Sequence, residues 1–313
     1  MDLSALHEEF LTYLEIERNY SPLTVTAYRS DFRLLLRYLE ASGTLRELAA
    51  LDRHCIRGYI AWMRGQELQP SSIARRLNSL RSFWKYLRDN EYASHDPFLR
   101  ISIPKSPKHV PHYLSASQCE ALLAAATEQR SVEQAFRDKA VLSVMIFQGL
   151  RRGEVLGLMV DDVQLEQQTV RVESGKGNKT RVLPLSGPTA EALRDWLELR
   201  GECRHEYLFT ARDGRRLGRK GLRGILRRAL TRAGLQEGQA TLHTLRHSFA
   251  CLMLRGGCDL FSLSQFLGHT RLDTTAVYLH ATVEDLRAQL PKHPLQNAAA
   301  GASSACGGLT DQP

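Results

Sequence analysis

The chain has 313 residues, enough for two domains, and a formal net charge of +8 that suits a polyanionic partner such as DNA or RNA. Six scattered cysteines without a C-x-x-C pair argue against a zinc ribbon or a disulfide framework and fit a reducing compartment. No apolar run reaches membrane-spanning length and the N-terminus is not a signal peptide, so we expect a cytoplasmic protein with no membrane partner.

The first 92 residues carry the apolar periodicity of amphipathic helices and predict a helical domain. Four stretches show it, over 3–14, 22–42, 52–63 and 71–88. Ser21 followed by Pro22 and, later, Asp52 are typical helix starts. The polar side of the last helix is basic and carries Arg75, Arg76, Arg81, Lys85 and Arg88. We interpret this face as a contact with the DNA backbone; the alternative is a face that water simply solvates.

Two stretches lack this periodicity. Residues 93–111 hold four prolines among lysines and predict an extended linker between two domains. The end of the chain, 292–313, is rich in Ala, Gly and Ser and predicts a disordered tail. The second domain therefore spans 112–291.

Helices open the second domain. We expect one capped by Ser117, an apolar one over 137–148, and a short one after Gly149. The short helix places Arg151 and Glu154 on one face, where the carboxylate could hold Arg151 or a neighbouring histidine in position.

A β-hairpin follows. Residues 169–173 and 180–185 predict short strands, and the turn between them has two glycines and presents Lys176 at its tip. The turn does not match the P-loop pattern of nucleotide-binding proteins.

The most basic stretch, 212–232, predicts a helix with apolar residues on one side. Arg219, Arg223 and Arg227 recur at i, i+4 and i+8 on the other side. Like charges at this spacing repel in an isolated helix, so the row indicates an anionic partner, contacted through DNA phosphates or the major groove.

Residues 243–278 contain several groups suited to phosphate chemistry. His243 and Arg246 share one helix face, His269 follows the helix stop Gly268, and a third helix would carry Tyr278. A guanidinium can bind a phosphate through two hydrogen bonds, and tyrosine can act as a nucleophile. The alternative is a packed helical bundle with these residues on its surface.

A zinc site is the less favoured interpretation of the same stretch. His243 and His247 have the spacing of the H-E-x-x-H motif. Thr244 stands where that motif has its general base, so we expect no metal.

Four motifs in this order resemble the tyrosine recombinases, most closely their Xer-type or phage-integrase-like branch. They are GLRRGEVLGL at 149–158, GKGNKTRVLPL at 175–185, HTLRHSFA at 243–250 and LGHTRLDTTAVYLH at 267–280. The resemblance implies a mainly α fold with a small β-sheet, made of a helical, SAM-like core-binding domain over 1–92 and an α+β catalytic domain over 112–291. It implies an active site of Arg151, Lys176, His243, Arg246, His269 and the nucleophile Tyr278.

Two positions depart from the family pattern. Thr241 and Leu242 precede His243 where proline is common, and Leu279 follows Tyr278 where threonine is common. Neither change removes a chemical group of the site.

The resemblance also implies a function: a site-specific DNA recombinase that acts through a 3′-phosphotyrosyl intermediate in integration, excision or dimer resolution. It implies specific core sites and a homotetramer on synapsed DNA, alone or with a paralogous recombinase, and no cofactor. Two alternatives stay open, a type IB-like DNA topoisomerase and a DNA-binding protein without chemistry.

The chemistry of the residues suggests a role for each. Arg151 and Arg246 can stabilise negative charge on the nonbridging oxygens. His243 is a candidate base, Lys176 a candidate acid for the leaving oxygen, and His269 a candidate hydrogen-bond donor to the phosphate. Beyond them, 282–290 predicts a short helix whose apolar stripe could dock on a neighbouring subunit or on its own domain.

Overall fold

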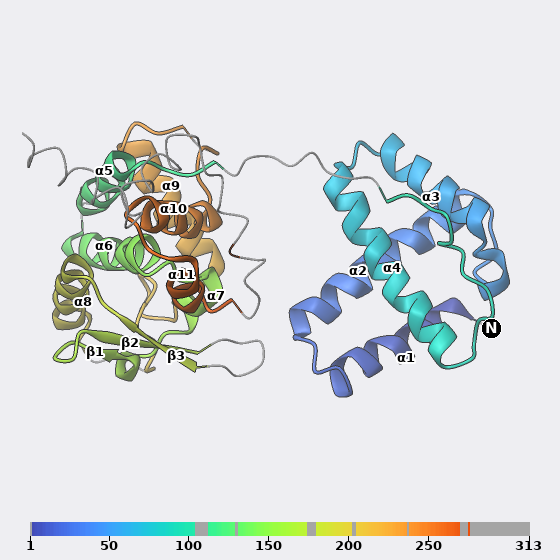
Figure 1. Ribbon diagram of the computed structural model, residues 1–313, viewed down its shortest axis with the longest axis horizontal. Coiled ribbons are helices and arrows are strands. Elements are labelled where there is room, and N and C mark those ends of the chain that lie inside the picture. The colour runs from blue at the N-terminus through green and yellow to red at the C-terminus, as the bar shows by residue number, and fades with distance from the viewer. Residues whose placement is uncertain are drawn as a thin grey trace, which may run out of the picture. The chain divides into compact units, whose positions relative to one another are not determined.

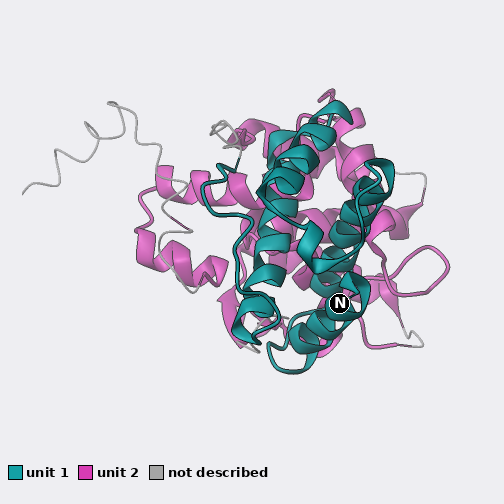
Figure 2. Ribbon diagram, turned by 90° about the vertical axis from the view of Figure 1, so that its right-hand side faces the viewer, with its two compact units in different colours: residues 1–109 teal, residues 110–313 magenta. Residues whose placement is uncertain are grey.

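The fold is taken from a computed structural model that describes residues 2–103, 112–128, 131–173, 180–201, 205–236, 238–269 and 275. The chain divides into two compact units, Met1–His109 and Val110–Pro313 (Figure 2). The division falls inside the stretch that composition predicts as a linker. Within the described ranges, no helix is both long and apolar enough to cross a membrane.

The first unit is a helical bundle. Its helices are α1 (Leu3–Ile16), α2 (Pro22–Ala41), α3 (Arg53–Gly65) and α4 (Pro70–Asp89), with a 3-10 turn at Leu48–Ala50 (Figure 1). The side chains of Asp2, Ser21 and Asp52 accept hydrogen bonds from backbone N–H groups of the first turns of α1, α2 and α3. These caps satisfy donors that a helix end would otherwise leave unpaired.

An aromatic cluster fills the core of this unit. The buried His7 ring stacks on Phe32 with centroids 3.8 Å apart and meets Phe83 edge-on. Burial lowers the pKa of His7 to about 4, so the ring is neutral near pH 7 and packs as one more aromatic side chain.

The basic face of α4 is partly engaged within the unit. Arg75 donates to both carboxylate oxygens of Asp31, at 2.5 and 2.6 Å, although half of the Arg75 side chain stays exposed. Arg76 is less exposed and lies 3.8 Å from the same carboxylate, whereas Lys85 is exposed. The Asp31 side chain is only 1% exposed, so these arginines neutralise a buried charge as well as forming a surface.

The chain after α4 stays on the first unit for some distance. Arg81 donates to the carbonyl of Ile101 at 2.9 Å, and the Trp84 indole donates to the carbonyl of His95 at 2.7 Å. Phe98 and Ile101 are buried in the core. Residues 93–103, which composition assigns to an extended linker, therefore pack along α4.

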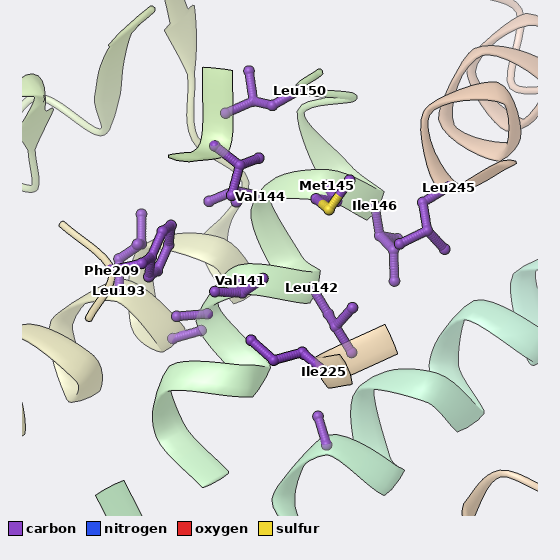
Figure 3. Close-up of a cluster of buried hydrophobic side chains, with 14 of the residues drawn as sticks. Val141, Leu142, Val144, Met145, Ile146, Leu150, Leu193, Phe209, Ile225 and Leu245 are labelled. Atoms are coloured by element: carbon purple, nitrogen blue, oxygen red, sulfur yellow. The ribbon is translucent and has the colours of Figure 1, made fainter. Parts of the chain in front are cut away.

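The second unit is built around one apolar helix, α6 (Val132–Phe147), which contacts α5 (Ala116–Thr127), α8 (Gly187–Arg200) and α10 (Leu242–Arg255). The remaining helices are α7 (Arg152–Gly157), α9 (Arg219–Arg232) and α11 (Leu260–Leu267), and a 3-10 turn lies at Val160–Asp162. Figure 3 shows Leu193 of α8, Ile225 of α9 and Leu245 of α10 gathered around α6. Ser115, not the expected Ser117, caps α5, because its side chain and that of Gln118 form a reciprocal capping box.

A small antiparallel sheet lies at one edge of the second unit (Figure 1). Its strands are β1 (Val163–Gln164), β2 (Thr169–Glu173) and β3 (Thr180–Pro184), in that order. In the register of β2 and β3, Thr169 pairs with Pro184 and Glu173 with Thr180. The mainly α fold with a small β-sheet is thus confirmed, and the hairpin strands lie where their pattern predicts them.

Candidate active site

The described residues of the four sequence motifs meet on one side of the second unit. Arg151 is the N-cap of α7, and Glu154 lies in the first turn of that helix. Arg181 comes from β3, His243 and Arg246 from α10, and His269 from the chain that leaves α11.

A buried carboxylate lies at the centre of this cluster. The Glu154 side chain is 5% exposed and accepts hydrogen bonds from Arg151 Nη1 at 2.9 Å and from Arg181 Nη1 and Nη2 at 2.9 and 3.0 Å. It also accepts from the Arg151 backbone N–H at 2.7 Å, and Arg246 Nη1 lies 3.9 Å away. Burial alone would raise the pKa of Glu154, but the bonds from Arg181 and Arg151 outweigh it and hold the pKa below its ordinary value.

Arg246 is held from several sides. It donates to the carbonyl of Gly149 at 2.7 Å, to that of Leu267 at 2.6 Å and to His269 Nε2 at 3.0 Å. Gly149 has φ of +61°, and a Cβ at this position would lie 2.3 Å from the Phe249 ring, so only glycine fits here. These contacts set the guanidinium of Arg246 in a buried frame of carbonyls.

His269 accepts a hydrogen bond rather than donating one toward Arg246. Arginine has no acceptor, so Nε2 of His269 is unprotonated and the proton lies on Nδ1, which donates to Thr275 Oγ1 at 2.9 Å. Burial, then the charges of Arg246, Arg151 and Arg181, lower the pKa of His269 to about 4. To donate a hydrogen bond to a phosphate, the role suggested by its chemistry, His269 would have to turn Nδ1 away from Thr275 or gain a proton on Nε2.

His243 lies one turn before Arg246 and is exposed. Partial burial of its ring and the charges of Arg246 and Arg151 lower its pKa, so the imidazole is neutral near pH 7 and can accept a proton. His247 of the zinc spacing is buried, with Nε2 3.8 Å from Cys251 Sγ. Among the described residues, no three His, Cys, Asp or Glu side chains gather as a metal would require.

The structure does not place every residue that the sequence assigns to the site. Lys176 and Tyr278 lie outside the described residues. Arg219, Arg223 and Arg227 of α9 are exposed, while Arg75, Arg76, Arg81 and Lys85 lie on α4 of the first unit.

Sequence analysis missed two neighbours of the site, Arg181 and Thr275. Arg181 lies two residues before the buried Leu183 on β3, and alternate residues of a strand share a face. A charged residue on an inward face was therefore the available signal. Thr275 is fully buried and close to Tyr278 in sequence, but no periodicity singled out its hydroxyl.

Two family models cover most of the chain. The model described as phage integrase family matches residues 112–285, and that described as phage integrase, N-terminal SAM-like domain, matches 7–91. The chain belongs to the phage integrase family of tyrosine recombinases. The resemblance carried by the four motifs is thereby confirmed.

Individual relatives agree with this assignment. The chain is similar to tyrosine recombinase XerD of Listeria innocua, with 34% identity over 90% of this chain and 95% of the relative. It is similar to tyrosine recombinase XerC of Chlorobaculum parvum, with 35% identity over 92% of this chain and 94% of the relative. The enzyme is therefore a tyrosine-type site-specific recombinase, and neither the topoisomerase nor the non-catalytic alternative is favoured.

Solved structures show the same fold. A XerH recombinase bound to palindromic difH substrate, a post-cleavage complex, superposes with a TM-score of 0.73 over 93% of this chain and 85% of that chain, at 22% identity. The crystal structure of XerA recombinase covers 94% of this chain and 99% of that chain at 25% identity, with a TM-score of 0.52.

Proposed function

We propose that this recombinase cuts and rejoins DNA strands at specific core sites in the cytoplasm, with Tyr278 as the nucleophile. The observation that carries the proposal is the gathering of Arg151, Arg246 and the neutral His269 around the buried Glu154, with the neutral His243 within range of the charges of both arginines. Guanidiniums beside a neutral imidazole suit phosphoryl transfer, which needs charge stabilisation and a proton acceptor together.

The reaction balances without an external energy source. The Tyr278 hydroxyl oxygen attacks phosphorus while its proton passes to His243, and the bond from phosphorus to the 5′-oxygen breaks. Lys176 protonates that leaving oxygen, which leaves a 3′-phosphotyrosyl ester and a free 5′-hydroxyl. Attack by the 5′-hydroxyl of another strand reverses these steps, so the exchange needs no ATP. Integration, excision and dimer resolution all use this chemistry.

Arg151 and Arg246 stabilise the negative charge that develops on the phosphate. The Arg151 side chain is 39% exposed, so a phosphate can reach its guanidinium directly. The Arg246 side chain is 2% exposed and stabilises the phosphate charge from the protein interior. The low local dielectric there strengthens its electrostatic effect. The lowered pKa of His243 keeps this base neutral to a lower pH than an ordinary histidine.

The first prediction concerns the covalent intermediate. A pool of nicked duplexes with randomised cores should form an adduct with the enzyme, because the short leaving piece diffuses away and rejoining cannot occur. Mass spectrometry of the adducted peptide should identify Tyr278. Tyr278→Phe should form no adduct, while Thr274→Val, which removes a neighbouring hydroxyl, should still form it. An adduct on another residue, or one that persists in Tyr278→Phe, contradicts the proposal.

DNA binding is proposed for both basic faces, that of α4 and that of α9. On α9, Arg219, Arg223 and Arg227 are exposed and lie opposite the buried Leu222 and Ile225. An exposed row of guanidiniums on one helix can follow a row of phosphates.

Arg223→Gln should flatten the dependence of log K on log salt by about one unit, because one phosphate contact is lost. Fluorescence anisotropy over a salt series measures this slope. Arg194→Gln, which removes an exposed arginine from α8, is the matched control and should leave the slope unchanged. Equal slopes of log K against log salt for both variants would mean that the α9 face is solvated and does not contact DNA.

We also propose that the active assembly is a tetramer on synapsed DNA, of this chain alone or with a paralogous recombinase. An apolar groove of about 240 Å³ lies between α5, α6 and α10. Its lining includes Leu123, Phe147 and Met253, and Glu120 adds one carboxylate. The apolar stripe of segment 282–290 and its Arg287 complement this lining, and we propose that a neighbouring protomer supplies them.

Leu286→Glu would place a charge in that apolar groove and should lower cooperative binding of two DNA sites by at least about tenfold. Binding to a single site should be unchanged in the same gel-shift titration. Ala288→Glu adds the same charge on the opposite helix face and serves as the control. Equal cooperativity of Leu286→Glu and the wild type would rule out this docking mode.

A further inference from the structure

Each of the three guanidinium nitrogens of Arg181 donates a hydrogen bond to a protein group at the centre of the site. Nη1 and Nη2 donate to the two oxygens of Glu154, at 2.9 and 3.0 Å, and Nε donates to the carbonyl of Phe266 at 3.1 Å. The side chain is 13% exposed. A parallel pair of hydrogen bonds from arginine to carboxylate is the strongest and most directional form of this contact. Arg181 is therefore arranged to hold Glu154, not to bind a phosphate.

The turn that follows α11 packs closely against the Arg181 side chain. Gly268 caps α11 with φ of +59°, and a Cβ at this glycine would lie 2.9 Å from Arg181 Nη1 and 3.1 Å from its Cζ. The Gly268 carbonyl accepts from Arg151 Nη2 at 3.3 Å. The guanidinium of Arg181 thus lies between the Glu154 carboxylate and the turn that leads to His269.

We propose that Arg181 is a positioning residue of the recombinase reaction, which fixes Glu154 and the Phe266–His269 turn and thereby sets Arg151 and His269 for the phosphate. Arg181 lies on β3, the strand that follows Lys176 in the sequence, and its contacts therefore join this strand to the arginine–histidine cluster. This inference rests on the proposed function. It assigns a role to a residue that does not itself contact the reacting atoms.

The contacts of Arg181 predict how the pH dependence of activity should change when this residue is removed. Four groups face Glu154: Arg151 of its own segment, Arg181 of β3, Arg246 of α10 and His269 after α11. Burial raises the pKa of Glu154, and the hydrogen bond from Arg181 is the largest effect that lowers it. Without Arg181 the pKa rises, so the carboxylate becomes protonated as pH falls and releases Arg151. Activity of the variant should therefore be lost at a higher pH than that of the wild type.

Arg171 on the adjacent β2 offers a matched control. It is also an arginine of the sheet paired with a buried carboxylate, Asp162, through Nε at 2.8 Å. This pair lies outside the cluster around Glu154. Single-turnover cleavage of a nicked substrate from about pH 5 to pH 9 compares Arg181→Ala, Arg181→Lys and Arg171→Ala.

Arg181→Ala should cleave at least about tenfold more slowly than Arg171→Ala at neutral pH and should show an acid limb at higher pH. Arg181→Lys should regain part of the rate, because an ammonium can replace one of the two bonds. Adding Glu154→Gln to Arg181→Ala should remove the displaced limb while leaving any limb due to His269. If Arg181→Ala is within about twofold of Arg171→Ala with the wild-type pH profile, or if the displaced limb survives Glu154→Gln, the inference is wrong.

A measurement on the free protein separates this inference from the proposed function. The ¹³C carboxyl resonance of Glu154 should titrate at higher pH in Arg181→Lys, and higher still in Arg181→Ala, than in the wild type. Absence of any adduct in the wild type would contradict the proposed function. An unchanged Glu154 titration would contradict the role of Arg181, whether or not the enzyme cleaves DNA.

Discussion

The buried carboxylate of Glu154 is the constraint on which the catalytic unit depends. An isolated carboxylate in a protein interior costs several kcal/mol, and nearby cations with good hydrogen-bond geometry are needed to offset that cost. Here Arg151, Arg181 and Arg246 come from α7, β3 and α10, which are far apart in the sequence. Neutralising the Glu154 carboxylate therefore brings together the three elements that carry these arginines.

The same charges define what the site can do. Three guanidiniums around one carboxylate leave an excess of positive charge, which is what a phosphate with developing negative charge requires. Burial and, after it, the charges of these arginines lower the pKa values of His243 and His269 and keep both rings neutral. The site thus combines strong cations with a proton acceptor, two properties that are difficult to bring together without a buried anion to space the arginines.

Sequence patterns predicted the parts of this structure that depend on local rules. The helices of both units follow apolar periodicity, and Ser21 and Asp52 cap the helices they were expected to cap. The cap of α5 was misplaced by two residues because Ser115, three residues before Gln118, and Ser117, three residues before Glu120, both fit the capping rule, and the structure forms the box with Ser115 and Gln118. The family resemblance implied that Arg151, His243, Arg246 and His269 belong to one active site. The structure places Arg151 and Arg246 beside Glu154 and His269 against Arg246, while the catalytic roles of all four residues stay a prediction.

What could not be predicted depends on long-range packing. The partners of Arg181 lie 27 and 85 residues away in sequence, so no local pattern contains them. The direction of the hydrogen bond between Arg246 and His269 follows from the contact itself, because arginine can only donate, and this leaves the His269 proton on Nδ1 beside Thr275. Residues 93–103 read as a linker because prolines interrupt the periodicity, yet Phe98 and Ile101 reach the core of the first unit.

The central claim is that this arginine cluster acts on the charge of the scissile phosphate. Replacing one nonbridging oxygen of that phosphate by a methyl group removes its charge and keeps its shape. Single-turnover cleavage rates of the wild type and Arg246→Ala on the normal and methylphosphonate substrates test the claim directly. Arg246→Ala should be slower by about 10²–10³ on the phosphate, and this defect should shrink at least about tenfold on the methylphosphonate. An equal defect on both substrates would mean that Arg246 only supports the fold, and would contradict the account.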